Sequence, residues 1–314
     1  MTLLMGKLID GIWYVSWSGD SEGIGIFMRQ PRTLVDIISP THPVYRPDAN
    51  RYHLYVSYAC PWATRALIYR QLKGREDYLS VDVVHPDMLE DGRVFDESFA
   101  VATRESHHGL KYLRQIYLQT EPWVSASVTV PVLWDKETES IVNNESSQII
   151  RIFKSAFDDL NGKTEDFYLS SLQPEIDDLS EKICKTANNG VYKTGFATNQ
   201  IIYDEAVTSL FKTLDELDQR LESSEYLLGD EVTEVDLRLI PALLRCDVVY
   251  FTHFKCNWKR IIDYRNLHRY MLGMYSIPAT KETFHLDHIK RHYYFSLERI
   301  NSHRITPKGS QQIF

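Results

Sequence analysis

The sequence predicts two domains: an α/β domain over residues 51–160, then an all-helical domain over residues 174–300. Strand and helix patterns alternate in the first stretch, whereas helical periodicity dominates from Pro174 onward. The segment between them, "DDLNGKTEDFYLSSLQP", has the polar composition of a linker. A chain of 314 residues is also near the size at which one hydrophobic core gives way to two.

The order of elements predicts the topology of the first domain. Strand patterns fall at 52–57, 78–86, 128–135 and 139–146, and helical patterns at 63–74 and 147–157. Gly74 is placed to follow the end of the first helix. The order β-α-β, insertion, β-β-α is typical of a thioredoxin-like domain. Residues 1–50, rich in Gly, Pro and Ser, are expected to form an irregular leader, and 301–314 a C-terminal tail.

Composition excludes several classes of function. The net charge of -8 disfavours a nucleic-acid partner, which requires a basic surface. No apolar run approaches the roughly 20 residues that cross a bilayer, so no membrane partner is expected. Lys7 and Asp10 interrupt the apolar start, unlike a signal peptide. The four cysteines, at 60, 184, 246 and 256, form neither a disulfide framework nor a zinc pattern, which predicts free thiols in a reducing, cytoplasmic setting.

Cys60, in "YVSYACPWATRAL", is the candidate nucleophile. If Pro61 is the first helical residue, Cys60 is the N-cap, where unpaired N–H groups and the helix dipole stabilise a thiolate. Ala63 stands where a dithiol oxidoreductase carries its second cysteine, so a disulfide at Cys60 needs an external thiol. Glutathione is the abundant thiol of such a compartment. The alternative is a buried structural cysteine.

Two further segments can bind such a thiol. In thioredoxin-like folds the proline that opens the third strand, here Pro131, is typically cis, which leaves the Val130 backbone free to pair with an extended ligand. An edge-strand proline is the alternative. Glu145 and Ser146 begin the next helix, where they can hold the ammonium and carboxylate of a γ-glutamyl group. Simple helix capping by Ser146 or Ser147 is the alternative there.

The strings "SYACPWATRALIYRQLKG", "GVYKTGFA" and "HIKRHYY" together resemble the xi-class glutathione transferases, or glutathionyl-hydroquinone reductases, which are relatives of the omega class. The resemblance covers roughly residues 10 to 295. It implies glutathione transferase architecture, a homodimer, glutathione as co-substrate, and reduction of glutathionylated quinols or similar aromatic conjugates. In that scheme Cys60 forms a mixed disulfide with glutathione, which a second glutathione resolves.

The resemblance also implies roles for individual residues. Val130, Glu145 and Ser146 are assigned to glutathione, and Tyr192 and Tyr293 to the pocket for the aromatic substrate, although tyrosines there can equally pack the helical domain. Tyr294 is a weaker candidate.

Two positions depart from the family pattern: Arg93 replaces a tryptophan, and Ser127 replaces an arginine that pairs with a glutathione carboxylate. We expect Arg93 to supply the missing cation.

Other patterns favour structural roles. His285, His288 and His292 share a helix face but lack a partner set typical of zinc, so no metal is expected. Thr233 and Asp236 form a predicted capping box, and Cys256 is expected to be structural. Two other functions remain open: a thiol transferase or dehydroascorbate reductase that uses Cys60, and a non-enzymatic binding protein on the same scaffold.

Overall fold

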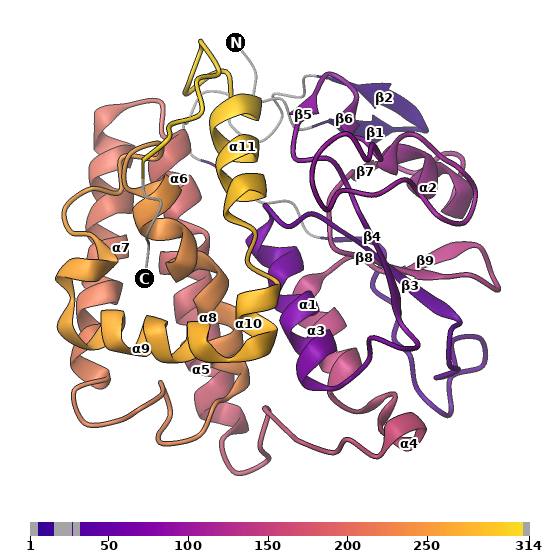
Figure 1. Ribbon diagram of the computed structural model, residues 1–314, viewed down its shortest axis with the longest axis horizontal. Coiled ribbons are helices and arrows are strands. Elements are labelled where there is room, and N and C mark those ends of the chain that lie inside the picture. The colour runs from indigo at the N-terminus through magenta and orange to yellow at the C-terminus, as the bar shows by residue number, and fades with distance from the viewer. Residues whose placement is uncertain (1–5, 16–26, 28–31, 310–314) are drawn as a thin grey trace. The chain divides into compact units, whose positions relative to one another are not determined.

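The computed structural model describes residues 6–15, 27 and 32–309, so 1–5, 16–26 and 28–31 of the expected leader and 310–314 of the expected tail lie outside it. The described residues group into two compact units (Figure 1). The first takes in those of Met1–Ser18, Gln30–Glu165 and Thr283–Arg299. The second takes in those of Gly19–Arg29, Asp166–Glu282 and Ile300–Phe314.

A mixed four-stranded sheet forms the centre of the first unit. Its order is β4 (Ser80–Val83), β3 (Tyr52–Val56), β8 (Val132–Asp135), β9 (Ser140–Asn143). Strands β3 and β4 are parallel, and the other neighbours are antiparallel. Every residue of β3 and β8 is buried, as expected for central strands. This topology confirms the predicted thioredoxin-like order.

Helices cover this sheet. Helix α1 (Pro61–Leu72) lies beside α3 (Ser146–Ser155), whereas α2 (Leu113–Thr120) packs against β9 (Figure 1). The short α4 (Asp158–Asn161) follows α3. Helix α1 ends as the sequence predicts: Gly74 has a φ of 56° and donates to the Gln71 carbonyl, while the Arg75 N–H donates to the Arg70 carbonyl.

The leader contains strands, although its composition predicts an irregular segment. Strands β1 (Lys7–Ile9) and β2 (Ile12–Tyr14) form a hairpin, and β1 also pairs with β7 (Ala126–Ser127). The expectation of an irregular segment is therefore wrong for these residues. Asp10 and Gly11, both with positive φ, make the turn, which is the Asp-Gly signal of a two-residue hairpin. Gly11 is required because a Cβ would lie 2.1 Å from the Pro122 carbonyl oxygen.

A second part of the leader extends the central sheet. The Asp36 N–H donates to the Val142 carbonyl, and the Asn144 N–H donates to the Leu34 carbonyl, so this segment runs along β9. A small hairpin of β5 (Met88–Leu89) and β6 (Gly92–Arg93) lies within the long insertion. The thioredoxin-like unit therefore includes the leader segment beside β9 and the β5–β6 hairpin, in addition to the main β-α-β pattern.

Helix α11 (Leu286–Ser296) also belongs to the first unit, although its sequence position had placed it with the helical domain. The reason is a set of side-chain bonds. Arg291 forms a bidentate pair with Asp87, at 2.6 and 2.8 Å. The Ser296 hydroxyl accepts the Met88 N–H at 2.9 Å. These bonds tie α11 to the β5–β6 insertion.

The second unit is helical. Its α-helices are α5 (Gln173–Ile183), α6 (Gly190–Phe196), α7 (Gln200–Arg220), α8 (Glu234–Arg245), α9 (Arg265–Ser276) and α10 (Pro278–Glu282). Cys184–Asn188 and Cys246–Tyr250 are π-helical, and Ile261–Asp263 is a 3₁₀ turn. The predicted capping box is confirmed: the Thr233 N–H donates to Asp236 at 2.8 Å.

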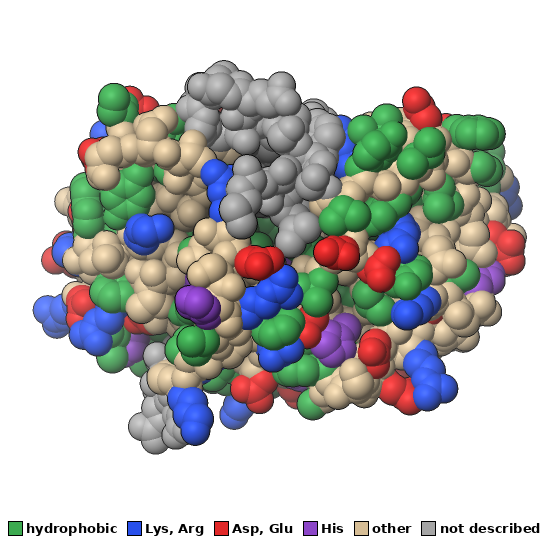
Figure 2. All heavy atoms as spheres, turned by 90° about the horizontal axis from the view of Figure 1, so that it is seen from above, with side chains coloured by type: hydrophobic (Ala, Val, Ile, Leu, Met, Phe, Trp, Pro, Cys, Tyr) green, Lys and Arg blue, Asp and Glu red, His purple; other side chains and the backbone are tan. Residues whose placement is uncertain are grey.

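The surface carries both charged and hydrophobic side chains. On the face shown in Figure 2, acidic and basic side chains are interspersed among hydrophobic ones. Across the described ranges, none of the helices combines the length and apolarity needed to span a bilayer. Several large apolar side chains are exposed in the first unit, Ile12 and Trp123 among them.

Candidate active site

Cys60 lies at the turn between β3 and α1, and Pro61 begins the helix, as predicted. The Cys60 N–H donates to the Ser57 carbonyl at 3.0 Å, and its own carbonyl accepts the Thr64 N–H at 2.9 Å. The Thr64 hydroxyl bonds the same carbonyl. These bonds fix Cys60 as the N-cap, where the helix dipole favours negative charge. Cys60 keeps 8% of its surface exposed.

The thiol contacts the segment that the sequence predicts to bind a ligand. Cys60 Sγ lies 3.6 Å from the Val130 carbonyl oxygen. The Val130–Pro131 peptide bond is cis, which confirms the prediction, and β8 begins at Val132. Val130 is 5% exposed. The structure therefore brings Cys60 and Val130 together.

Glu145 and Ser146 lie at the start of helix α3, but the capping differs from the expected alternative, in which Ser146 or Ser147 is the N-cap. Glu145 itself is the N-cap: its Oε1 accepts the Ser147 N–H at 3.0 Å and the Ser147 hydroxyl at 2.9 Å. Neither Ser146 nor Ser147 is the cap, because the chain turns into the helix one residue earlier. The Glu145 N–H donates to the Asn143 side chain. The Glu145 carboxylate thus stands beside the first N–H groups of α3.

Tyr293 lies on α11, in the same unit as Cys60, and is 3% exposed. The start of this helix reaches the cysteine turn. The rings of Tyr58 and His285 have centroids 3.8 Å apart, and Tyr58 precedes Cys60 by two residues. Tyr294 is buried too, at 7%. Helix α11, which carries Tyr293, therefore contacts the turn that carries Cys60 through its N-cap residue His285.

The three histidines near the start and along the face of α11 have structural partners. His288 Nε2 donates to the Ala100 carbonyl at 2.6 Å, and His292 Nδ1 donates to the Pro86 carbonyl at 2.8 Å, while His285 packs on Tyr58. Within the ranges that the structure describes, no group of three or more His, Cys, Asp or Glu residues is arranged to hold a metal ion. The bonds of His288 and His292 therefore also attach α11 to the insertion between β4 and β8.

His288 should make this attachment sensitive to acid. Burial lowers the pKa of His288, and His285 and His85 add to this; the Ala100 carbonyl and Asp287 act in the opposite direction. Below the ordinary histidine pKa of about 6.5 the unfolded chain takes up a proton that the folded chain resists. Stability is therefore complete above that value and falls as the pH drops toward the lowered value.

We expect urea unfolding to show a larger loss of stability between about pH 7.5 and about pH 5.5 in the native chain than in His288→Gln. Glutamine keeps a donor for Ala100 but does not titrate. His303→Gln, at an exposed histidine, is the matched control and should retain the native pH dependence. An unchanged pH dependence in His288→Gln would contradict this explanation.

Arg93 and Ser127, the two departures from the family pattern, lie on separate sheets of the first unit. Arg93 is on β6, paired with Met88. Ser127 is on β7, and its register partner on β1 is Lys7. Directly opposed residues of an antiparallel pair have Cβ atoms about 5 Å apart. A cation therefore stands beside position 127, and the expectation of an irregular leader gave no indication that Lys7 lies there.

Tyr192 lies on α6 of the second unit, in an aromatic cluster. Its ring centroid is 5.9 Å from that of Phe27, 5.5 Å from Phe254 and 6.1 Å from Tyr250. Gly195 admits this packing, since a Cβ there would lie 2.3 Å from the Phe254 ring. Phe27, from the leader, is a member of the cluster that sequence periodicity could not identify.

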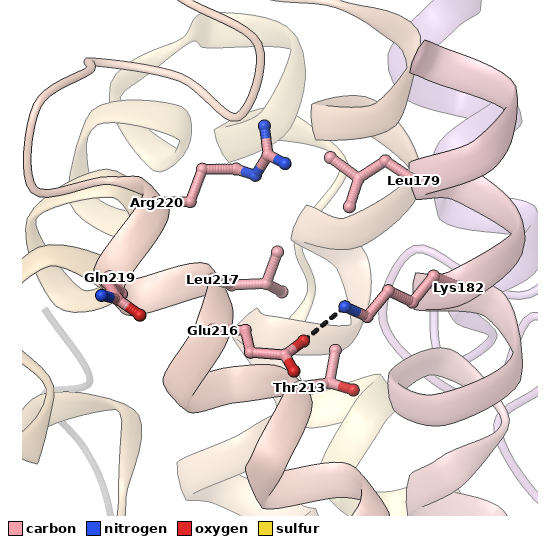
Figure 3. A pocket seen from close by; sticks show the side chains of 7 residues that line it. All are labelled: Leu179, Lys182, Thr213, Glu216, Leu217, Gln219 and Arg220. Atoms are coloured by element: carbon pink, nitrogen blue, oxygen red, sulfur yellow. Dashed lines mark hydrogen bonds and ion pairs between the residues drawn. The ribbon is translucent and has the colours of Figure 1, made fainter. Parts of the chain in front are cut away.

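The second unit also has a groove of about 400 Å³ between α5 and α7 (Figure 3). Lys182 of α5 points toward Glu216 of α7, and the two form an ion pair. Leu179, Leu217 and Arg220 also line the groove. None of its lining residues is a predicted site residue, and none is a cysteine or histidine. The groove therefore lacks the chemistry assigned to Cys60.

Comparison with known proteins decides the family. Residues 59–156 match the model for the glutathione S-transferase N-terminal domain, and residues 200–272 match that for the C-terminal domain. Glutathionyl-hydroquinone reductase YqjG of Escherichia coli (strain K12) is 46% identical over 98% of this chain and 96% of its own length. A Xi glutathione transferase structure from Phanerochaete chrysosporium has a TM-score of 0.89 at 46% identity, over 91% of this chain and 93% of that one. This chain belongs to the Xi-class glutathione transferases.

A further Xi-class structure, from Natrialba magadii, has a TM-score of 0.94 at 42% identity and covers 99% of this chain and 96% of that one. The glutathione-bound structure of YqjG has a TM-score of 0.90 at 44% identity, with 98% and 96% covered. The Xi-class identification and the transferase architecture predicted from the sequence are both confirmed. The first unit carries the thioredoxin-like half and the second the helical half of this Xi-class chain.

Proposed function

We propose that this chain reduces glutathionyl-hydroquinones, with Cys60 as nucleophile and glutathione as co-substrate. One observation carries the proposal: Cys60 is the N-cap of α1 and lies beside the Val130 carbonyl, with Ala63 in place of a second cysteine. The names of relatives support it, since YqjG and PcpF of Sphingobium chlorophenolicum are both glutathionyl-hydroquinone reductases. YqjG has also been solved with glutathione bound, which supports the co-substrate.

The reaction has two steps. The Cys60 thiolate attacks the sulfur of the glutathionyl thioether, so a disulfide bond forms while the carbon–sulfur bond breaks. The electron pair of the broken bond passes to the ring carbon, which takes up a proton and leaves as hydroquinone. A second glutathione thiolate then attacks the mixed disulfide, releasing glutathione disulfide and the Cys60 thiolate. Because position 63 is alanine, no local thiol competes in this second step.

In this proposal the Val130 backbone pairs with the cysteinyl part of glutathione, beside Pro131, and Glu145 and Ser146 bind its γ-glutamyl end. Tyr192 and Tyr293 are assigned to the aromatic substrate, for which a phenolic hydroxyl donates to a quinol oxygen and assists protonation of the ring carbon. The cis peptide at Pro131 and the position of Glu145 beside the first N–H groups of α3 support the glutathione assignments.

The test is mass spectrometry of the intact protein after exposure to a glutathionyl-hydroquinone without free glutathione. We expect one glutathione adduct, at Cys60, and an equal amount of released hydroquinone. Free glutathione added afterwards should remove the adduct. Turnover of dehydroascorbate or mixed disulfides with no adduct from the conjugate would instead identify a thiol transferase or dehydroascorbate reductase. Absence of any turnover would favour a binding protein.

Arg93 is proposed to pair with a glutathione carboxylate in place of the cation missing at Ser127. Losing a charge-assisted hydrogen bond should weaken glutathione binding about 10-fold in Arg93→Ala. Isothermal titration calorimetry measures this directly. Arg104→Ala is the matched control, because Arg104 is an exposed cation of the same insertion that pairs with Glu97. If Arg93→Ala binds glutathione with native affinity and Lys7→Ala binds it more weakly, Lys7 supplies the cation instead.

We further propose that the chain is a homodimer that works in the cytoplasm. The absence of a second thiol beside Cys60 requires a reducing pool of glutathione, and all four cysteines are free, which supports such a compartment. Light scattering of the purified protein tests the oligomeric state. A mass equal to one chain would exclude the dimer.

A further inference from the structure

The hydroxyl group of Tyr117 connects the two segments that are proposed to bind glutathione. Tyr117 lies on α2 and is fully buried. Its hydroxyl donates to the Thr129 carbonyl at 2.9 Å and accepts the Thr129 N–H at 3.2 Å. It also accepts a hydrogen bond from Asn144 Nδ2 at 3.2 Å. A phenol has one donor and two acceptor positions, so all three are used.

The hydrogen bonds of the Tyr117 hydroxyl form a bridge, Thr129–Tyr117–Asn144, between residues that lie next to the proposed glutathione-binding segments. Thr129 directly precedes Val130, whose carbonyl contacts the Cys60 thiol. Asn144 directly precedes Glu145, the N-cap of α3. One oxygen atom therefore fixes the residue before each proposed glutathione-binding segment. The bridging residue comes from outside the central sheet, because Tyr117 belongs to the insertion between β4 and β8.

Burial makes the bridge hard to replace. Asn144 is 3% exposed, and its Oδ1 has no hydrogen-bond partner in the part of the chain that the structure describes. The bond to Tyr117 is therefore what orients this amide. The Thr129 N–H and carbonyl both depend on the same hydroxyl. Tyr117 and Asn144 are buried and Thr129 is partly buried, so removal of the hydroxyl leaves the Asn144 amide without its partner and loosens the Thr129 backbone.

We propose that Tyr117 is a positioning residue for the glutathione site, through the bridge Thr129–Tyr117–Asn144. The inference rests on the proposed function, because it takes Val130 and Glu145 as glutathione contacts. An extended tripeptide that spans both segments binds well only when their separation is fixed before it arrives. The hydroxyl fixes that separation without touching the substrate or Cys60.

Tyr117→Phe tests the proposal, because it keeps the buried ring and removes only the hydroxyl. We expect glutathione to bind about 10-fold more weakly by calorimetry, with a matching rise in KM for glutathione and little change in kcat. Alkylation of Cys60 by iodoacetamide, which needs only the thiol, should proceed at the native rate. Asn144→Ala removes one of the three bonds and should give a smaller change of the same kind.

The matched control is Tyr52→Phe. Tyr52 is also fully buried, and its hydroxyl donates to the Arg46 carbonyl at 2.6 Å, so the variant likewise keeps a buried ring and loses a hydrogen-bonded hydroxyl in the same unit. Both variants should lower the melting temperature, but only Tyr117→Phe should weaken glutathione binding. Native glutathione affinity in Tyr117→Phe, or an equal loss in Tyr52→Phe, would overturn the proposal. Failure of the native protein to reduce glutathionyl-hydroquinones would instead count against the proposed function, since binding is measured separately.

Discussion

Replacement of Cys60 by serine is expected to lower the reduction of glutathionyl-hydroquinones by roughly 10³-fold or more. A serine hydroxyl keeps the size of the side chain and the N-cap position. However, it is scarcely ionised near neutral pH and cannot form the mixed disulfide with glutathione. The measurement is the rate of hydroquinone release from a glutathionyl conjugate in the presence of free glutathione. Intact-mass analysis of the same variant should show no adduct.

Cys256→Ala is the matched control for this loss. Burial raises the pKa of the Cys256 thiol to about 12, and the thiol lies within 4.0 Å of the Val191 and Phe254 carbonyls, so it stays protonated near neutral pH. We expect Cys256→Ala to keep native turnover and to form the adduct at Cys60. Native turnover by Cys60→Ser, or an adduct that persists in it, would remove Cys60 from the mechanism.

The features that the sequence predicted well depend on neighbouring residues. Cys60 and Pro61 mark the start of α1 because proline fixes the backbone at the first helical position. Thr233 and Asp236 form their capping box within a single turn. In the same way, the hairpin at Asp10 and Gly11 has a local signal in "KLIDGIWY", although the many turn residues of the surrounding leader favour an irregular segment.

The features that were missed depend on residues distant in the chain. Tyr117 and Asn144 are 27 positions apart, and no periodicity of either segment indicates that they meet. The bonds from α11 to the insertion span about 200 positions, so sequence order alone assigned the helix to the wrong neighbours. Lys7 became a candidate only when the register of β1 against β7 was known. Candidate reactive residues can thus be found locally, whereas the residues that hold them cannot.

Contacts between distant residues also hold the polar segment after α3, whose composition predicts a linker. Asp158, at its start, accepts a bond from Arg75 at 2.5 Å and from Lys73 at 3.1 Å. Both cations have fully buried side chains at the end of α1. Arg75 also donates to the Phe157 carbonyl and to Asn161. Asp158 is the carboxylate that compensates these two buried charges.

Asp158→Asn is therefore expected to lower the free energy of unfolding by about 3 kcal/mol, because removing one partner leaves buried charges uncompensated. Urea unfolding followed by tryptophan fluorescence measures this loss. Asp159→Asn is the matched control: it removes a carboxylate from the same first turn of α4, but Asp159 is exposed, so the change should stay within about 0.5 kcal/mol.

A second variant separates the charge effect from a general weakening of this segment. In the Asp158→Asn background, Lys73→Met removes one of the two uncompensated cations while keeping a long side chain. If the buried charge is the cause, the double variant should be more stable than Asp158→Asn alone, as expected for coupled residues in one network. If the two losses simply add, Asp158 contributes through some interaction other than the compensation of Lys73.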